Sequence, residues 1–225
     1  MTFSEHIVEY FRSLRFDIEL PNGVESMNPY LLPSTMDAVE KYYHKYYNDN
    51  NPRTFIVGIN PGRFGSGVTG IAFTDTVRLE KDCHIEHSIQ PTTELSSEYI
   101  YNVVNAMGGA SEFFARYYLT ALSPIGFTKD GKNYNYYDSP AMVKATLPYM
   151  KEQFEQQIAF GANRKAVFSL GSGKNHQYLT HINEMLGKPF ERVEAINHPR
   201  FVMQYRRKTM QQEIATFINT INNDR

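Results

Sequence analysis

Residues 55–73 read FIVGINPGRFGSGVTGIAF, and this stretch decides the fold. Its first six residues, Phe55–Asn60, are mostly β-branched, aromatic or aliphatic, which predicts a buried strand. A loop follows in which four glycines fall within the nine positions 62–70. Glycine lets a backbone bend sharply and approach a ligand closely. The stretch therefore predicts a strand that leads directly into a binding loop.

Three more runs of the same apolar character occur further along the chain: Tyr118–Ser123, Ala166–Gly171 and Arg192–Asn197. The segments around them carry helical periodicity and helix start and stop residues, which predicts helices near 94–107, 111–116, 139–160, 176–186 and 206–221. Strands that alternate with helices predict a parallel sheet covered on both faces. We therefore expect an α/β fold of three layers, α/β/α, around a central four-stranded parallel sheet.

The first 50 residues are expected to form a helical N-terminal extension, with helices at Phe3–Leu14 and Thr35–Tyr47. Four tyrosines recur at helical spacing in the second helix, and such a stripe usually packs in the core: Tyr42, Tyr43, Tyr46 and Tyr47. A chain of 225 residues has little length for a second full core, so a single domain, 1–225, is expected.

Composition narrows the class of protein. No apolar run approaches the roughly 20 residues that cross a bilayer, and Cys83 is the only cysteine, so we expect a cytoplasmic protein without a membrane segment. A net charge of −1 is unusual for a nucleic-acid-binding protein. A local basic rim is nevertheless available near the C-terminus: Arg200, Arg206, Arg207 and Lys208.

Ligands of open parallel α/β sheets bind beyond the carboxyl ends of the strands, which selects four loops. These loops are residues 60–73, 123–127, 171–175 and 197–200, and all of them are rich in glycine or polar residues. The glycines of the first loop do not have the G-x-G-x-x-G spacing of a dinucleotide-binding motif. The third loop fails as a phosphate-binding loop, because Phe168 stands where a glycine is required and Asn175 replaces Ser or Thr.

Metal and nucleophile sites are also poorly supported by the sequence. Cys83, His84 and His87 lack a clear fourth ligand, and no serine lies in a G-x-S-x-G turn. We therefore expect chemistry without a metal, a cofactor or a covalent nucleophile. An enzyme that acts on nucleotides, built on the same kind of α/β sheet, remains a distant alternative hypothesis.

Several motifs carry a family resemblance when taken in order. Gly58–Gly62 is followed by Phe64-Gly65, Thr69-Gly70 and Phe73, then by Leu122–Ile125 and finally by His198-Pro199. These motifs resemble the single-strand-selective monofunctional uracil-DNA glycosylases of the uracil-DNA glycosylase superfamily, and the similarity spans residues 28–208. The resemblance implies a monomeric enzyme of base excision repair that acts on DNA containing a damaged base.

The resemblance also implies residue roles. Asn60 would position the water that attacks the sugar C1′, and His198 would donate a hydrogen bond to a carbonyl oxygen of the departing base. This division of roles between Asn60 and His198 suits a reaction in which an oxocarbenium-like sugar and an anionic base develop together. Gly62, Phe64 and Phe73 would contact the flipped base, through backbone amides and through stacking.

DNA contacts are expected around the mouth of the site. Residues 200–205, with Phe201, Val202 and Met203, would form a wedge that fills the place of the extruded base. The expected set of DNA-binding residues is Arg63, Lys174, Arg200, Phe201, Val202 and Arg206.

One departure from the family bears on the substrate. The family's base-recognising asparagine is replaced here by Ala121. Uracil, xanthine and hypoxanthine all become expected substrates, and Asn133 or Asn135 is a candidate for the missing amide. The same departure motivates an alternative hypothesis, a non-catalytic module that binds damaged or single-stranded DNA.

Overall fold

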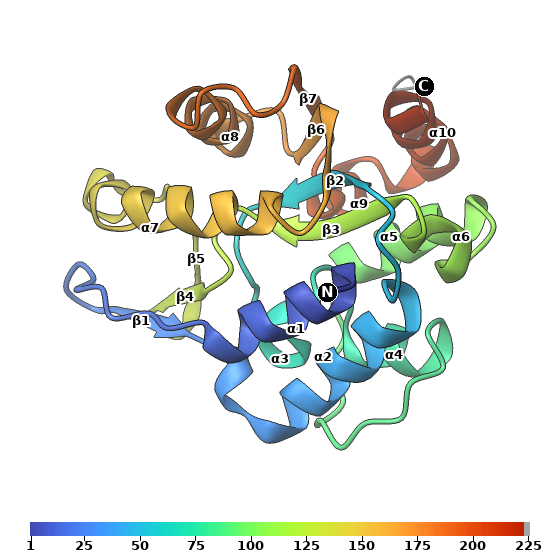
Figure 1. The fold of residues 1–225 in the computed structure, drawn as a ribbon, viewed down its shortest axis with the longest axis horizontal. Helices are drawn as coiled ribbons and strands as arrows, with labels where there is room; N and C mark the ends of the chain where they lie inside the picture. Colours follow the sequence, from blue (N-terminus) through green and yellow to red (C-terminus); the bar gives the residue numbers. More distant parts are fainter. Residues whose placement is uncertain (223–225) are drawn as a thin grey trace.

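The computed structural model describes residues 1–222, and a four-stranded parallel sheet forms its centre (Figure 1). The strand order is β3-β2-β6-β7, with all neighbours parallel. The strands are β2 (Arg53–Gly58), β3 (Tyr117–Ala121), β6 (Ala162–Leu170) and β7 (Arg192–Ile196). They coincide with the four runs selected from the sequence, so the predicted parallel sheet is confirmed.

Helices flank this sheet and complete the α/β/α arrangement (Figure 1). The helix α8 packs on β6 and β7, whereas α5 packs on α9 and α10. The helices are α1 (Phe3–Ser13), α2 (Pro33–Tyr46), α3 (Ser66–Thr69), α4 (Thr76–Lys81), α5 (Leu95–Ala106), α6 (Ala110–Phe114), α7 (Pro140–Ile158), α8 (Lys174–Met185), α9 (Pro199–Tyr205) and α10 (Met210–Asn222), with the 3₁₀ turns η1 (Pro29–Leu31) and η2 (Arg207–Thr209). Within residues 1–222, none of these helices has the length and apolarity needed to span a membrane.

A second, antiparallel sheet was not predicted from the sequence. Its order is β1-β4-β5, formed by β1 (Val24–Met27), β4 (Gly126–Lys129) and β5 (Lys132–Tyr134). The β4–β5 turn is Asp130-Gly131, and both residues have positive φ, +50° and +66°. An Asp-Gly pair with positive φ at both positions is a preferred two-residue hairpin turn. The turn signal was therefore present in the sequence, but the strands beside it are too short to show clear alternation.

The region around residues 198–209 also differs from the prediction. It was expected to be a loop followed by a helix from 206 to 221, but it contains α9 and η2, and the closing helix α10 begins only at Met210. Pro199 occupies the first turn of α9, where proline is well tolerated, and the side chain of His198 caps the helix. The glycine-rich loop contains a further short helix, α3, that the sequence did not indicate.

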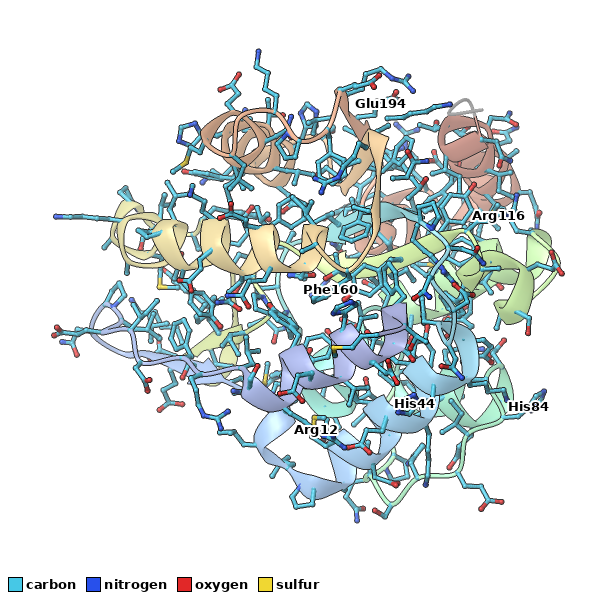
Figure 2. The ribbon with its side chains drawn as sticks, viewed as in Figure 1. Arg12, His44, His84, Arg116, Phe160 and Glu194 are labelled. Carbon is cyan, nitrogen blue, oxygen red and sulfur yellow. The ribbon has the colours of Figure 1, made fainter. Side chains whose placement is uncertain are left out.

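An aromatic core joins the N-terminal helices to the sheet. The four tyrosines at the end of α2 are buried, which confirms their predicted packing role. Phe3 of α1 makes edge contacts with Phe55 of β2 and Tyr118 of β3, at centroid distances of 6.4 and 5.4 Å. Phe160 lies between α7 and α1 in Figure 2, where its ring is 5.3 Å from that of Tyr10. Aromatic pairs of this kind stabilise a core beyond their buried area.

Arg53, the first residue of β2, is completely buried. Its guanidinium binds the carboxylate of Asp49 with two nitrogens, one of them at 2.9 Å. It also donates to the carbonyl oxygens of Asn51, at 2.6 Å, and of Phe114, at 3.2 Å. The rings of Phe3 and Tyr47 lie 5.3 and 5.4 Å from its central carbon. This network fixes the entrance to the central strand.

We expect Arg53→Lys to lower the free energy of unfolding by about 2 kcal/mol, because lysine cannot replace the planar fork of hydrogen bonds. Urea denaturation followed by circular dichroism measures the change. Arg12→Lys is the matched control, because Arg12 forms an exposed pair with Glu40 that should contribute less than about 1 kcal/mol. Equal losses in the two variants would contradict this account of the Arg53 network.

Candidate active site

A cavity of about 430 Å³ opens beyond the carboxyl ends of β2, β3 and β6, where the topology rule placed the site. Ten of the residues singled out from the sequence line it: Asn60, Gly62, Phe73, Ala121, Asn133, Asn135, Lys174, His198, Arg200 and Phe201. The cavity thus brings together residues from segments that are far apart in the chain.

Asn60 follows β2 and lies in the wall of this cavity. Its side-chain nitrogen donates to the carbonyl oxygens of Tyr134, at 3.3 Å, and of Pro61, at 3.4 Å. Its side-chain oxygen accepts from the backbone N–H of Tyr136, at 3.3 Å. The unpredicted β4–β5 hairpin and the residues after it therefore fix the orientation of this amide.

His198 lies at the N-terminus of α9, and its Nδ1 accepts from the backbone N–H of Arg200 at 3.2 Å. An acceptor at Nδ1 leaves the proton of the neutral ring on Nε2. Burial, with a smaller contribution from the charge of Arg200, lowers the pKa of His198 to about 4. At neutral pH the site therefore presents an uncharged imidazole with one N–H donor.

Phe73 presents its ring to the cavity from an unusual backbone position. Its φ is +54°, in the left-handed region that L residues other than glycine rarely adopt. A Cβ atom at Gly58 would lie 2.6 Å from Cζ of this ring, so glycine at the end of β2 is what makes room for it. The ring centroid lies 6.3 Å from that of His198. A flat aromatic face thus adjoins the imidazole.

Asn175, at the start of α8, is a buried site residue that sequence reasoning missed. Its side-chain nitrogen donates to the carbonyl oxygen of Val57 at 3.1 Å and to Ser169 Oγ at 3.0 Å. Its side-chain oxygen accepts from the hydroxyl of Tyr136 at 2.9 Å. Tyr136 therefore connects Asn175 to Asn60. The only sequence signal was the position of Asn175 at the end of the loop 171–175, which was expected beyond a strand.

Glu94, just before α5, is a second missed residue of the cavity wall. Its Oε1 lies 3.1 Å from the position that a Cβ at Gly62 would occupy, and its Oε2 fills the space beside Gly65. Burial, reinforced by the negative charge of Asp75 and opposed by Arg200, raises the pKa of Glu94 to about 7. In the sequence, Glu94 stands at the start of a predicted helix. Nothing at that position distinguishes it from a surface residue.

The candidates for the missing recognition amide both lie in the cavity wall. Asn133 Oδ1 accepts from the backbone N–H of Arg63 at 3.0 Å, which ties the hairpin to the glycine-rich loop. The side-chain nitrogen of Asn135 donates to Asp138 at 3.3 Å. Ala121 itself contributes only a methyl group to the wall at the end of β3.

The mouth of the cavity carries exposed aromatic and basic side chains. Phe201 and Tyr205 are 41% and 73% exposed, lie one helical turn apart on α9, and have ring centroids separated by 5.5 Å. Lys174 donates to the carbonyl oxygen of Tyr137 at 3.2 Å. Arg206 is exposed at the end of α9, outside the cavity. These groups form one aromatic and basic rim, and Tyr205 belongs to the stretch 200–205 that was predicted to form a wedge.

Two sequence predictions require correction. Val202 was expected to contact DNA and Met203 to belong to the same wedge, but both side chains are buried. Because α9 is a helix, the side chain of Val202 projects away from that of Phe201 and packs inward. Phe64 was expected to contact the base, but it lies outside the cavity lining, half exposed, with the guanidinium carbon of Arg63 4.4 Å from its ring centroid. Phe64 and Arg63 therefore belong to the outer surface of the loop.

Metal-binding clusters were sought throughout residues 1–222, and no group of three or more His, Cys, Asp or Glu side chains there could hold an ion. Cys83 is buried, and its Sγ lies 3.0 Å from the hydroxyl of Tyr101.

Comparison with known proteins gives a consistent result. The sequence model of the uracil DNA glycosylase superfamily matches residues 44–222. Among solved structures, wild-type SMUG2 of Pedobacter heparinus is similar with a TM-score of 0.95 and 42% sequence identity, over 99% of this chain and 98% of that one. No curated protein matches the sequence.

We expect His198 to remain neutral, with its proton on Nε2, from pH 8 down to about pH 5, because its pKa is lowered to about 4. Long-range ¹H–¹⁵N correlation spectra report both the tautomer and the protonation of the ring. The His198→Ala variant assigns the signals. A midpoint near the unperturbed value of about 6.5, or a proton on Nδ1, would contradict the described environment.

Proposed function

The chain belongs to the uracil-DNA glycosylase superfamily, and we propose that it is a monofunctional DNA glycosylase that hydrolyses the N-glycosidic bond of a deaminated base in base excision repair. The observation that carries the proposal is the placement of Asn60 and His198 in one cavity beside the ring of Phe73. A glycosylase needs these elements: a group that orients water, a donor for the departing base, and a stacking face.

Asn60 is proposed to orient the attacking water. Both hydrogens of its amide nitrogen are directed to backbone carbonyls, and its oxygen accepts from Tyr136, which leaves a second lone pair on that oxygen. An amide does not take up a proton at neutral pH, so Asn60 would act by position. The water would bond to C1′ and release its proton to solvent. The gain comes from holding the reactants in near-attack geometry.

His198 is proposed to stabilise the departing base. As the bond between the base and C1′ breaks, the electron pair moves to the base, and negative charge develops on a carbonyl oxygen next to the cleaved nitrogen of uracil. A neutral imidazole that donates Nε2–H to this oxygen needs no proton transfer. One preorganised donor of this kind contributes about 3 kcal/mol, roughly a hundredfold in rate. The lowered pKa of His198 keeps this donor uncharged.

The extruded base is proposed to stack on Phe73, a contact that contributes roughly 1–3 kcal/mol. Backbone amides near Gly62 would contact the edge of the base. Phe201 and Tyr205 of α9 would fill the gap left in the DNA, because their rings are exposed at the mouth of the cavity. Lys174, Arg200 and Arg206 would contact phosphates.

The proposed substrates are uracil, xanthine and hypoxanthine. Ala121 offers no polar group to select one base edge, so the pocket would distinguish bases less strictly than a site with an amide there. The proposal also includes action as a cytoplasmic monomer without a cofactor, as expected from the sequence. A non-catalytic module that binds damaged DNA is the alternative, motivated by the same alanine.

The decisive measurement is single-turnover excision from end-labelled oligonucleotides that each contain one uracil, xanthine or hypoxanthine, followed by alkaline cleavage. We expect the parent to excise at least one base, and Asn60→Ala and His198→Ala to slow excision by about 10²–10³-fold. His181→Ala, an exposed change on α8, is the control that should retain full activity.

Each other outcome has a distinct meaning. If the parent retains damaged DNA but excises nothing, the binding-module alternative replaces the enzyme. If excision occurs but is unaffected in Asn60→Ala and His198→Ala, the reacting groups lie elsewhere.

A further inference from the structure

Glu94 and His198 both line the cavity and pack against different glycines. The carboxyl group of Glu94 is in contact with the glycine-rich loop at Gly62 and Gly65. His198 instead lies near Gly171 at the end of β6, with its Cβ 3.8 Å from where a Cβ of that glycine would be. The cavity lining therefore holds two ionisable groups that contact different glycines.

The carboxyl group of Glu94 has no internal partner. Within residues 1–222 it makes no hydrogen bond or ion pair, although the backbone N–H of Glu94 donates to Asp75 at 2.8 Å. Both carboxylate oxygens of Asp75, by contrast, accept a hydrogen bond, because the other one caps α4 by accepting from the N–H of Arg78 at 2.9 Å. A largely buried carboxyl without a partner, facing a cavity, is available to a ligand.

Charged groups from neighbouring elements set the protonation of Glu94. Asp75, at the start of α4, raises its pKa, and Arg200 of α9 lowers it, but burial outweighs both, and the pKa is about 7. Lys174 and His198 also line the cavity. On α5 itself, Glu98 faces Arg207 at 3.4 Å. A substantial fraction of Glu94 is therefore protonated at neutral pH and can donate a proton.

A purine base has a ring nitrogen, N7, that can accept this proton. In a nucleotide, the two edges of the base on either side of the glycosidic bond differ. A pyrimidine carries O2 on one edge, and a purine carries N3 there and N7 on the opposite edge. If His198 contacts the O2 or N3 edge, N7 of a purine lies on the other edge of the base, and among the described residues that line the cavity Glu94, held against the glycine-rich loop, supplies the carboxyl group.

We propose that Glu94 is a general acid that protonates N7 of hypoxanthine or xanthine during excision, an inference that rests on the proposed glycosylase function. In this step the C1′–N9 bond breaks and its electron pair moves to N9, while the carboxyl proton of Glu94 moves to N7, so that the base leaves uncharged. Water bonds to C1′ and releases a proton to solvent, and solvent reprotonates the Glu94 carboxylate. Uracil has no ring nitrogen on that edge and needs only His198.

Glu94→Gln tests this assignment, because glutamine has the same size and can donate a hydrogen bond but cannot transfer a proton. We expect single-turnover excision of hypoxanthine to fall by about 10²-fold, while excision of uracil changes less than about threefold. Excision of uracil by the variant also shows that it is folded. Glu112→Gln, on the distant helix α6, is the matched control and should leave both rates unchanged.

The pH dependence of the parent provides a second measurement that needs no variant. The acid form of Glu94 is present below its pKa of about 7 and is lost above it, so excision of hypoxanthine should fall about tenfold between pH 6 and pH 8. Excision of uracil should stay nearly constant over this range, because His198 is neutral throughout. Glu94→Gln should abolish the difference between the two profiles.

Three results would overturn the proposal. Equal losses for hypoxanthine and uracil in a folded Glu94→Gln variant would show that Glu94 only supports the loop. Parallel pH profiles, or excision of uracil by the parent without excision of either purine, would show that no proton is delivered to N7. Failure to excise any base would instead refute the proposed function itself, and the inference with it.

Discussion

The site depends on the central position of β2 in the parallel sheet. This strand is hydrogen-bonded to β3 on one edge and to β6 on the other, and every residue of it is buried. A strand enclosed in this way can present a side chain to a ligand only where it ends. Its carboxyl end opens into the glycine-rich loop and places Asn60 in the cavity, while the neighbouring ends of β3 and β6 supply the remaining walls. The buried arginine at the start of β2 secures the opposite end, so the strand cannot slide relative to the site.

The sequence predicted those parts of the molecule that obey local or repeating rules. The four parallel strands were identified because each is a short, continuous apolar run, and the loops beyond their carboxyl ends follow from the topology. Asn60, Phe73 and His198 could be selected because the motifs that contain them resemble those of the uracil-DNA glycosylase superfamily. The β4–β5 hairpin was missed because three- and four-residue strands show too little alternation. Glu94 and Asn175 were missed because their importance arises from burial, which depends on the packing of distant segments. Val202 was misassigned because residues 199–205 form a helix, which turns adjacent side chains in different directions.

Burial shifts the pKa values of His198 and Glu94 in opposite directions, and in both cases it favours the neutral form of the side chain. It lowers the pKa of His198 and raises that of Glu94, because the charged form is the less stable one for each side chain in a poorly solvated place. Near neutral pH His198 is consequently in its neutral, hydrogen-donating form, and a substantial fraction of Glu94 is in its own neutral form. In the proposed function, such a cavity receives an uncharged base without first displacing an ion pair, and both groups donate to the leaving group as its negative charge grows. Positive charge is confined to the rim, where Lys174 and Arg200 are exposed.

The way in which Asn60 is held has a consequence for divergence within this superfamily. Its amide is fastened entirely by main-chain atoms, the carbonyl oxygens of Pro61 and Tyr134 and the N–H of Tyr136. Substitutions in the hairpin and directly after it that preserve the backbone path can therefore alter side chains of the cavity wall, such as Asn133 and Asn135, without replacing a hydrogen-bond partner of this amide. In the proposed function, the side chains that select the base and the amide that orients water can therefore change independently, so that a lineage can exchange one damaged base for another while its hydrolytic chemistry stays unchanged.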